Sequence, residues 1–111
     1  MSELLDTAAL DSLRELGDDF FRELVETFLE SSREQMEAIR QAAKDADAGL
    51  MEAAAHSLKG ASRQQGAVVL AECCRKLEEM GKEGDLDGIN PLLEKTEDSY
   101  RKTIEELEGL V

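Results

Sequence analysis

Residues 48–66 read AGLMEAAAHSLKGASRQQG, and this stretch decides the fold of the chain. On a helical wheel of about 100° per residue, four of its apolar residues fall within an arc of about 80°. These are Leu50, Ala54, Leu58 and Ala61. A stripe of this kind is typical of a helix that packs one face against a core. The stretch therefore predicts a helix from about Ala48 to Gln65, capped by Asp47 and ended by Gly66.

His56, the only histidine of the sequence, lies on the other side of this wheel and should face solvent. Lys59 and Arg63 share the outward face with it, and Gly60 beside them has no side chain. A neutral imidazole is nucleophilic at physiological pH. A nearby cation can offset the charge of a phosphoryl group on Nε2. This arrangement is typical of a histidine that carries a phosphoryl group.

Length and composition indicate one all-α domain that spans residues 1–111. The net charge of −13 repels nucleic acid and anionic membrane surfaces, so protein partners are favoured. No apolar run approaches the roughly 20 residues of a membrane span, and the first residues do not resemble a signal peptide. We therefore expect a cytoplasmic protein. We also expect a monomer, because the apolar stripes are used within the chain.

Two adjacent cysteines, Cys73 and Cys74, lie in the middle of a predicted helix. A disulfide between neighbours would be strained there, so both thiols are expected to be reduced, with Cys73 in the core and Cys74 at its margin. With a single histidine elsewhere, the sequence has no set of metal ligands.

The apolar periodicity predicts three further helices that precede the final helix of the chain. A short helix from Thr7 to Leu16 can be capped by Asp6, and a long helix runs from a cap at Asp18 to about Asp45. Another helix, at residues 67–82, is closed by the segment 81–84.

The start of the final helix has two interpretations. Leu86 and Ile89 are in phase with Leu93, which favours a start at Asp85. Pro91 favours a start at Asn90, with proline at the first helical position. We expect the early start, with an irregularity near the proline. The four longer helices should form an antiparallel up-down-up-down four-helix bundle, with the short N-terminal helix as a cap on one end.

The motif His-x-x-Lys-Gly-x5-Gly, from His56 to Gly66, resembles that of the histidine-containing phosphotransfer (HPt) domains of bacterial phosphorelays. The likeness extends over essentially the whole chain, from the Gly-Asp-Asp-Phe-Phe-Arg-Glu-Leu opening of the long helix to a final helix. It implies that His56 takes a phosphoryl group from a phospho-aspartate of a response-regulator receiver domain and passes it to another receiver. Receiver domains, including those of a hybrid histidine kinase, are the expected partners.

The resemblance further implies that the receiver brings Mg²⁺ and that this chain needs no cofactor of its own. The chain would be a phosphorelay intermediate and not an enzyme, which fits the lack of a Gly-rich nucleotide loop in the sequence.

In members of this family a residue on the following helix, often glutamine, hydrogen-bonds the imidazole Nδ1. That position falls on Glu78 here, and a carboxylate can accept the same hydrogen. Lys59 is expected to stabilise the phospho-imidazole, and Lys82 would add positive charge. Gly60 is expected to give a partner clearance, because glycine inside a helix costs roughly 0.5–1 kcal/mol relative to alanine. Solvated surface roles remain the alternatives for Lys59 and Glu78.

Three residues at the end of the motif helix depart from the pattern or lie outside it. Arg63 is a candidate phosphate or partner contact, and Gln64 lies near the surface, where it could contact a receiver. Gln65 occupies a position where relatives commonly have an apolar residue, and it points towards the bundle on the wheel.

Other classes of protein are alternative interpretations of the sequence. A helical adaptor could use the same face for binding without being phosphorylated. The phosphate-accepting domain of a chemotaxis kinase shares the fold and the motif. The dimerisation helices of a histidine kinase typically have an acidic residue after the histidine and a proline nearby, whereas Ser57 follows His56 here and no proline is near.

Overall fold

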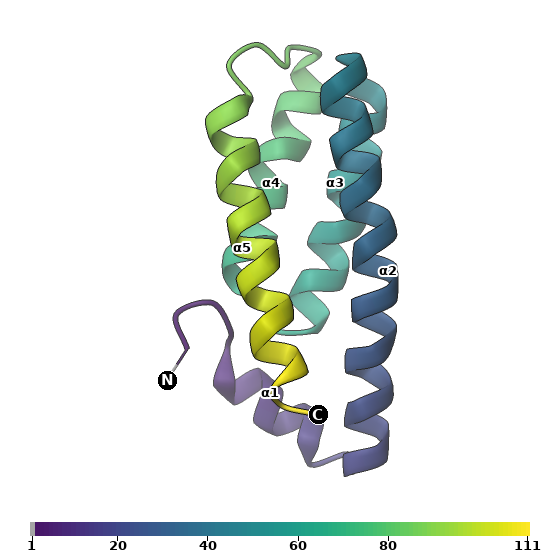
Figure 1. Ribbon diagram of the computed structural model, residues 1–111, viewed down its shortest axis with the longest axis vertical. Helices are drawn as coiled ribbons and strands as arrows, with labels where there is room; N and C mark the ends of the chain where they lie inside the picture. Colours follow the sequence, from purple (N-terminus) through teal and green to yellow (C-terminus); the bar gives the residue numbers. More distant parts are fainter. Residues whose placement is uncertain (1) are drawn as a thin grey trace.

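The structure is a computed structural model that describes residues 2–111, and these residues form five α-helices. Their bounds are Thr7–Arg14 (α1), Asp18–Asp45 (α2), Ala48–Gln64 (α3), Val68–Glu83 (α4) and Asn90–Glu108 (α5). Helices α2 to α5 alternate in direction and form an elongated bundle, and the short α1 lies across one end of it (Figure 1). The expected all-α bundle is confirmed.

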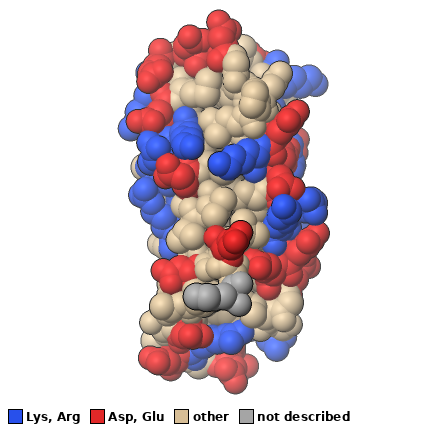
Figure 2. All heavy atoms as spheres, turned by 90° about the vertical axis from the view of Figure 1, so that its left-hand side faces the viewer, with Lys and Arg blue, Asp and Glu red and all other residues tan. Residues whose placement is uncertain are grey.

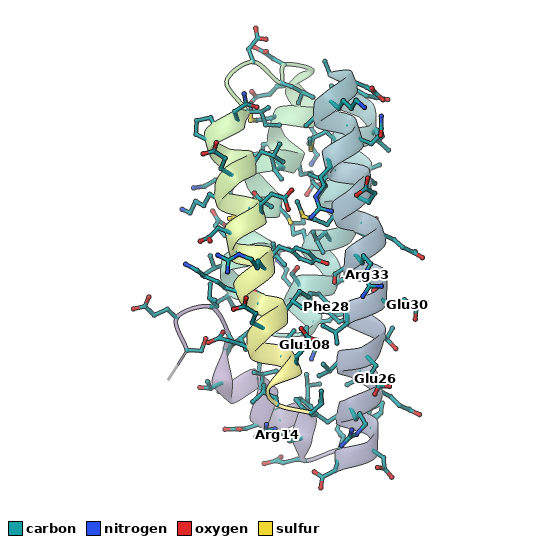
Figure 3. The ribbon with its side chains drawn as sticks, in the orientation of Figure 1. Arg14, Glu26, Phe28, Glu30, Arg33 and Glu108 are labelled. Atoms are coloured by element: carbon teal, nitrogen blue, oxygen red, sulfur yellow. The ribbon has the colours of Figure 1, made fainter. Side chains whose placement is uncertain are left out.

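One apolar core runs along the bundle and receives side chains from all five helices. On α2, Phe28 points inward, whereas Glu26 and Glu30 point to solvent (Figure 3). Burial of a large aliphatic side chain contributes about 1.5–3 kcal/mol relative to exposure, so this core dominates the stability of the fold. Its largest fully buried apolar side chains are Met36, Ile39, Met51, Leu58, Leu70, Leu77 and Leu107.

Two of the three predicted helix caps are confirmed, and the third is wrong. The Asp47 side chain accepts a hydrogen bond from the Leu50 amide at 3.0 Å, and Asp6 accepts one from the Ala9 amide at 3.1 Å. Asp18, expected to cap α2, is already its first helical residue. Gly17 is the N-cap, because its φ of 119° makes the turn. Asp18 instead lies in the first turn, where its charge is favourable near the positive end of the helix dipole.

Gly66 ends the motif helix as predicted and joins it to the N-terminal segment. Its φ is 77°, and its carbonyl accepts a hydrogen bond of 2.7 Å from the Asp6 amide. Leu5, which is buried, pairs with Ala67 in an isolated antiparallel bridge. These contacts hold the entrance of α1 against the turn between α3 and α4.

The expected early start of the last helix is wrong, because α5 begins at Asn90 with Pro91 in its first turn. A proline there forfeits no hydrogen bond, since the amides of the first turn have no partner within the helix. Residues 85–88 form a turn in which the Asp87 amide donates to Asp85 Oδ1 at 2.9 Å. Leu86 and Ile89 still pack on the core, but they reach it from this connection, outside the helix.

The segment 81–84 closes α4 as predicted: Gly84, with a φ of 75°, is the left-handed C-cap, and its amide donates to the Gly81 carbonyl at 3.1 Å. Gly81 has a second role that the sequence does not reveal, because it is buried within the helix. A Cβ at position 81 would lie 2.6 Å from the Glu52 backbone nitrogen and 2.8 Å from the Ala48 carbonyl oxygen. Glycine therefore lets α3 and α4 approach closely at this point.

Both cysteines are buried: Cys73 is 3% exposed, as predicted, whereas Cys74, expected at the margin, is fully buried in the central core. Both thiols are free. Burial raises the pKa of the Cys74 thiol to about 12, which keeps it protonated and unreactive at neutral pH.

Charged side chains cover the outside of the bundle. Acidic and basic groups are interspersed on the face that Figure 2 shows, and the end with the α4–α5 turn is acidic, with Glu83, Asp85 and Asp87 exposed. Among residues 2–111, none of the helices has a stretch that is long and apolar enough to cross a membrane.

Candidate functional site

The candidate site is centred on His56, in the middle of α3. Ala54, Ala55 and Leu58 are buried in the core, which turns the imidazole outward. The His56 side chain is 68% exposed. The helical pattern of the sequence is therefore sufficient to present one imidazole to solvent, in the direction that the wheel predicts.

Glu78 of α4 orients this imidazole. Its Oε2 lies 2.9 Å from His56 Nδ1, and its side chain is only 6% exposed. A carboxylate can only accept here, so the ring hydrogen in this contact belongs to Nδ1. In the neutral ring the lone pair is then on Nε2, the nitrogen that faces away from Glu78. The contact that the family resemblance implied for position 78 is present.

Lys59 is directed at Glu78 as well. Its Nζ lies 2.5 Å from Glu78 Oε1, and its side chain is 16% exposed. The Lys59 ammonium is thus an ion-pair partner of a buried carboxylate and does not stand free beside the ring. The sequence does not reveal this pairing, because it depends on how α3 and α4 pack.

Lys82 completes the group from the exposed side. It follows Glu78 by one turn of α4, and its Nζ lies 3.6 Å from Oε2, the same oxygen that contacts His56. Its side chain is 59% exposed. The Glu78 carboxylate therefore lies among an imidazole and two ammonium groups.

The electrostatics of the site follow from this grouping. The adjacent Lys59 ammonium, helped by the hydrogen bond from His56, lowers the pKa of Glu78 to about 2, although burial acts in the opposite direction. Glu78 is consequently ionised at neutral pH. A permanent negative charge next to Nδ1 favours a ring that gains positive charge when Nε2 forms a bond.

Gly60 leaves the surface next to His56 open. Apart from the neighbouring backbone of α3 itself, a Cβ at this position would meet no heavy atom within 4 Å among residues 2–111. Packing within the described chain therefore does not require glycine at position 60. The remaining explanation for glycine at this position is that it lets another molecule approach His56 closely.

Arg63 and Gln64 are exposed on the last turn of α3, and Gln65 is buried. The buried position of Gln65 agrees with the helical wheel. Its Nε2 has no hydrogen-bond partner within residues 2–111.

Gln64 borders an apolar groove that the sequence analysis missed. We call it the α1–α2 groove, and its lining includes Leu13, Leu16, Phe20, Leu24, Ala61 and Gln64. Leu16 is 62% exposed and Phe20 is 42% exposed, so the groove brings two exposed large apolar side chains together. The sequence holds a signal for this groove: Phe21 is in phase with the core of α2, so the adjacent Phe20 must point elsewhere.

The comparisons with known proteins agree with this geometry. The Hpt domain family model matches residues 23–110. The crystal structure of histidine-containing phosphotransfer protein B (HptB) from Pseudomonas aeruginosa PAO1 is similar, with a TM-score of 0.92 and 32% sequence identity. The match covers 98% of this chain and 95% of that one. Comparison with curated protein sequences gives no match. The family match and the structural similarity together establish that the chain belongs to the Hpt domain family.

Proposed function

We propose that the chain is a phosphorelay intermediate that accepts a phosphoryl group on His56 Nε2 from a receiver-domain phospho-aspartate and passes it to another receiver. The observation that carries this proposal is the exposed imidazole whose Nδ1 is held by Glu78 at 2.9 Å. The hydrogen bond selects the tautomer with a free lone pair on Nε2, and the exposure lets a partner reach it.

In the proposed reaction, the Nε2 lone pair attacks the phosphorus of the acyl phosphate. The bond between phosphorus and the aspartate oxygen breaks, and the aspartate carboxylate leaves with the electron pair. The proton stays on Nδ1, so the ring becomes a phospho-imidazolium next to the Glu78 carboxylate. Onward transfer reverses these steps: a carboxylate oxygen of the second receiver attacks the phosphorus, and the electron pair of the broken bond returns to Nε2.

The chain contributes position and charge to this reaction. Lys59 and Lys82 add positive charge around the His56–Glu78 pair, and Gly60 leaves the approach to Nε2 clear. We place Mg²⁺ and the remaining catalytic groups on the receiver, so that the chain acts as a phosphoryl carrier without an ATP site of its own. Its cytoplasmic location and its monomeric state stay predictions from the sequence.

The docking surface in this proposal extends from His56 along α3 to the α1–α2 groove. Gln64 lies eight residues after His56, or about 12 Å along the helix axis. The exposed side chains of Leu16 and Phe20 lie in the groove that Gln64 borders. An apolar patch next to a reactive group supports docking of a protein partner, here a receiver domain. Arg63, exposed on the same turn as Gln64, is a further candidate contact.

The test is phosphotransfer from purified receivers that carry a labelled phospho-aspartate. The proposal expects the label to reach the wild-type chain, to be absent from His56→Gln, and to move on to a second receiver. The matched control is Ser57→Ala, an exposed neighbour that should be labelled normally. Receivers that bind the chain without labelling it would support the adaptor alternative and contradict the proposal.

A further inference from the structure

The two lysines beside Glu78 contact it in different ways. Lys59 Nζ lies 2.5 Å from Oε1, and Lys82 Nζ lies 3.6 Å from Oε2. The Lys59 side chain is 16% exposed and the Lys82 side chain is 59% exposed. Lys59 is thus largely buried together with the Glu78 carboxylate, whereas Lys82 is exposed to solvent beside it.

Lys59 is the counter-ion that the buried carboxylate needs. A carboxylate that is almost fully buried is strongly unfavourable unless an opposite charge is next to it. If Lys59 moved away to a phosphoryl group, Glu78 would lose its closest cation while still enclosed. Lys59 is therefore held where it is, and its influence on His56 passes through the Glu78 carboxylate.

Lys82 has the opposite properties. Its contact with Glu78 is long and exposed, so little is lost when it breaks. It shares Oε2 with His56, which places its ammonium on the imidazole side of the carboxylate. A long, flexible side chain at this position can turn from Glu78 to a new anion on the ring.

We infer that Lys59 is a positioning residue that acts on His56 only through Glu78, and that Lys82 is the cation that contacts the phosphoryl group. This inference rests on the proposed role of His56 as phosphoryl acceptor. It reassigns the stabilising charge from the lysine of the motif to a lysine on the next helix.

The experiment is a double-mutant cycle in the full chain, with phosphoramidate as phosphoryl donor. In this loading reaction Nε2 attacks phosphorus, the N–P bond of phosphoramidate with its protonated nitrogen breaks, and ammonia leaves with the electron pair of that bond. Lys59→Met and Lys82→Met are made both in the wild type and in Glu78→Gln. The readouts are the loading rate of His56 and the nitrogen NMR resonances of its ring before loading. Helix content and thermal unfolding show that each variant is folded.

For Lys59→Met we expect the ring resonances to move, because the carboxylate that accepts from Nδ1 has lost its main counter-ion. In the Glu78→Gln background the same substitution should change the loading rate by less than about twofold, since no carboxylate remains to be held. The neutral amide in that double variant also leaves no buried charge unpaired, so a general loss of fold cannot imitate this result.

For Lys82→Met we expect unchanged ring resonances and loading that is slower by about two- to tenfold, as for the loss of one partly exposed charge contact. The same loss should appear in the Glu78→Gln background. Equal slowing by Lys59→Met in both backgrounds, with unmoved resonances, would overturn the assignment of Lys59. An unchanged loading rate in Lys82→Met would overturn the assignment of Lys82 as the cation that contacts the phosphoryl group.

Phosphoramidate loads His56 without a receiver, so the double-mutant cycle tests the roles of the two lysines independently of the proposed function. A chain that is loaded by phosphoramidate and takes no label from any receiver would contradict the phosphorelay proposal, while the cycle still decides the roles of the two lysines. A wild-type His56 that phosphoramidate does not load would contradict both.

Discussion

Gly81 of α4 lies directly against the backbone of Glu52 in α3, where a Cβ on residue 81 would stand 2.6 Å from the Glu52 nitrogen. Gly81 follows Glu78 by about one turn, and Glu52 precedes His56 by about one turn. This close approach of the two helices therefore lies next to the contact between His56 and Glu78. The spacing of α3 and α4 at this point determines whether Glu78 can reach the imidazole.

Gly81→Ala should destabilise the fold by about 1–3 kcal/mol, because the added methyl group forces the α3 and α4 backbones apart. Urea unfolding would measure the change. Gly60→Ala is the matched control: it also replaces a glycine inside a helix, but its Cβ meets no atom of residues 2–111 within 4 Å. That variant should gain about 0.5–1 kcal/mol. Equal effects of the two substitutions would contradict the close-packing argument.

Gly60→Gln should slow phosphotransfer from a receiver by about a hundredfold, because a side chain beside His56 displaces the incoming phosphoryl group from its in-line position. Helix content should be nearly unchanged. Gly49→Gln is the control, since Gly49 lies in the same helix, about two turns before His56. Transfer at the wild-type rate in Gly60→Gln would mean that clearance at this position has no role.

The pairing of Glu78 also predicts a pH dependence of stability. Its pKa is lowered from 4.5 to about 2, first by the ion pair with Lys59. A carboxylate with a lowered pKa stabilises the folded state above its ordinary pKa, and this contribution is lost as the pH falls through the folded value. The stability difference between wild type and Glu78→Gln should thus be constant above pH 4.5 and shrink from there towards pH 2. Denaturant unfolding across this window tests it, and a difference that does not change with pH would contradict the assignment.

The parts of the fold that depend on nearby residues could be predicted from the sequence. The cap at Asp47, the break at Gly66 and the outward direction of His56 follow from local hydrogen bonding and helical phase. The resemblance to the family located Glu78 next to Nδ1, which phase alone could not do because the two residues lie on different helices.

Predictions from the sequence are wrong or incomplete where tertiary packing determines the local structure. Leu86 matches the phase of α5 although it packs on the core from the preceding turn, whereas Ile89 matches it because it is the N-cap of α5 and has helical φ and ψ. The sequence predicts the part that Gly81 plays in the end of α4, but it does not reveal the backbone of Glu52 against Gly81. The contact of Lys59 with Glu78 Oε1 likewise depends on the separation of α3 and α4.

The α1–α2 groove gives the last prediction, which concerns docking. Phe20→Ser should weaken binding to a receiver by about tenfold, or about 1.4 kcal/mol, because Phe20 is a large apolar side chain that is 42% exposed in the groove. Loading of His56 by phosphoramidate should be unchanged, since this small donor needs no docking surface. Leu110→Ser is the matched control: Leu110 is 37% exposed and borders a different groove, near the C-terminal end of α5. Titration of a purified receiver against the three proteins gives the affinities. If Phe20→Ser binds the receiver as tightly as Leu110→Ser and the wild type, receivers do not use this groove, and the docking surface must lie elsewhere around His56.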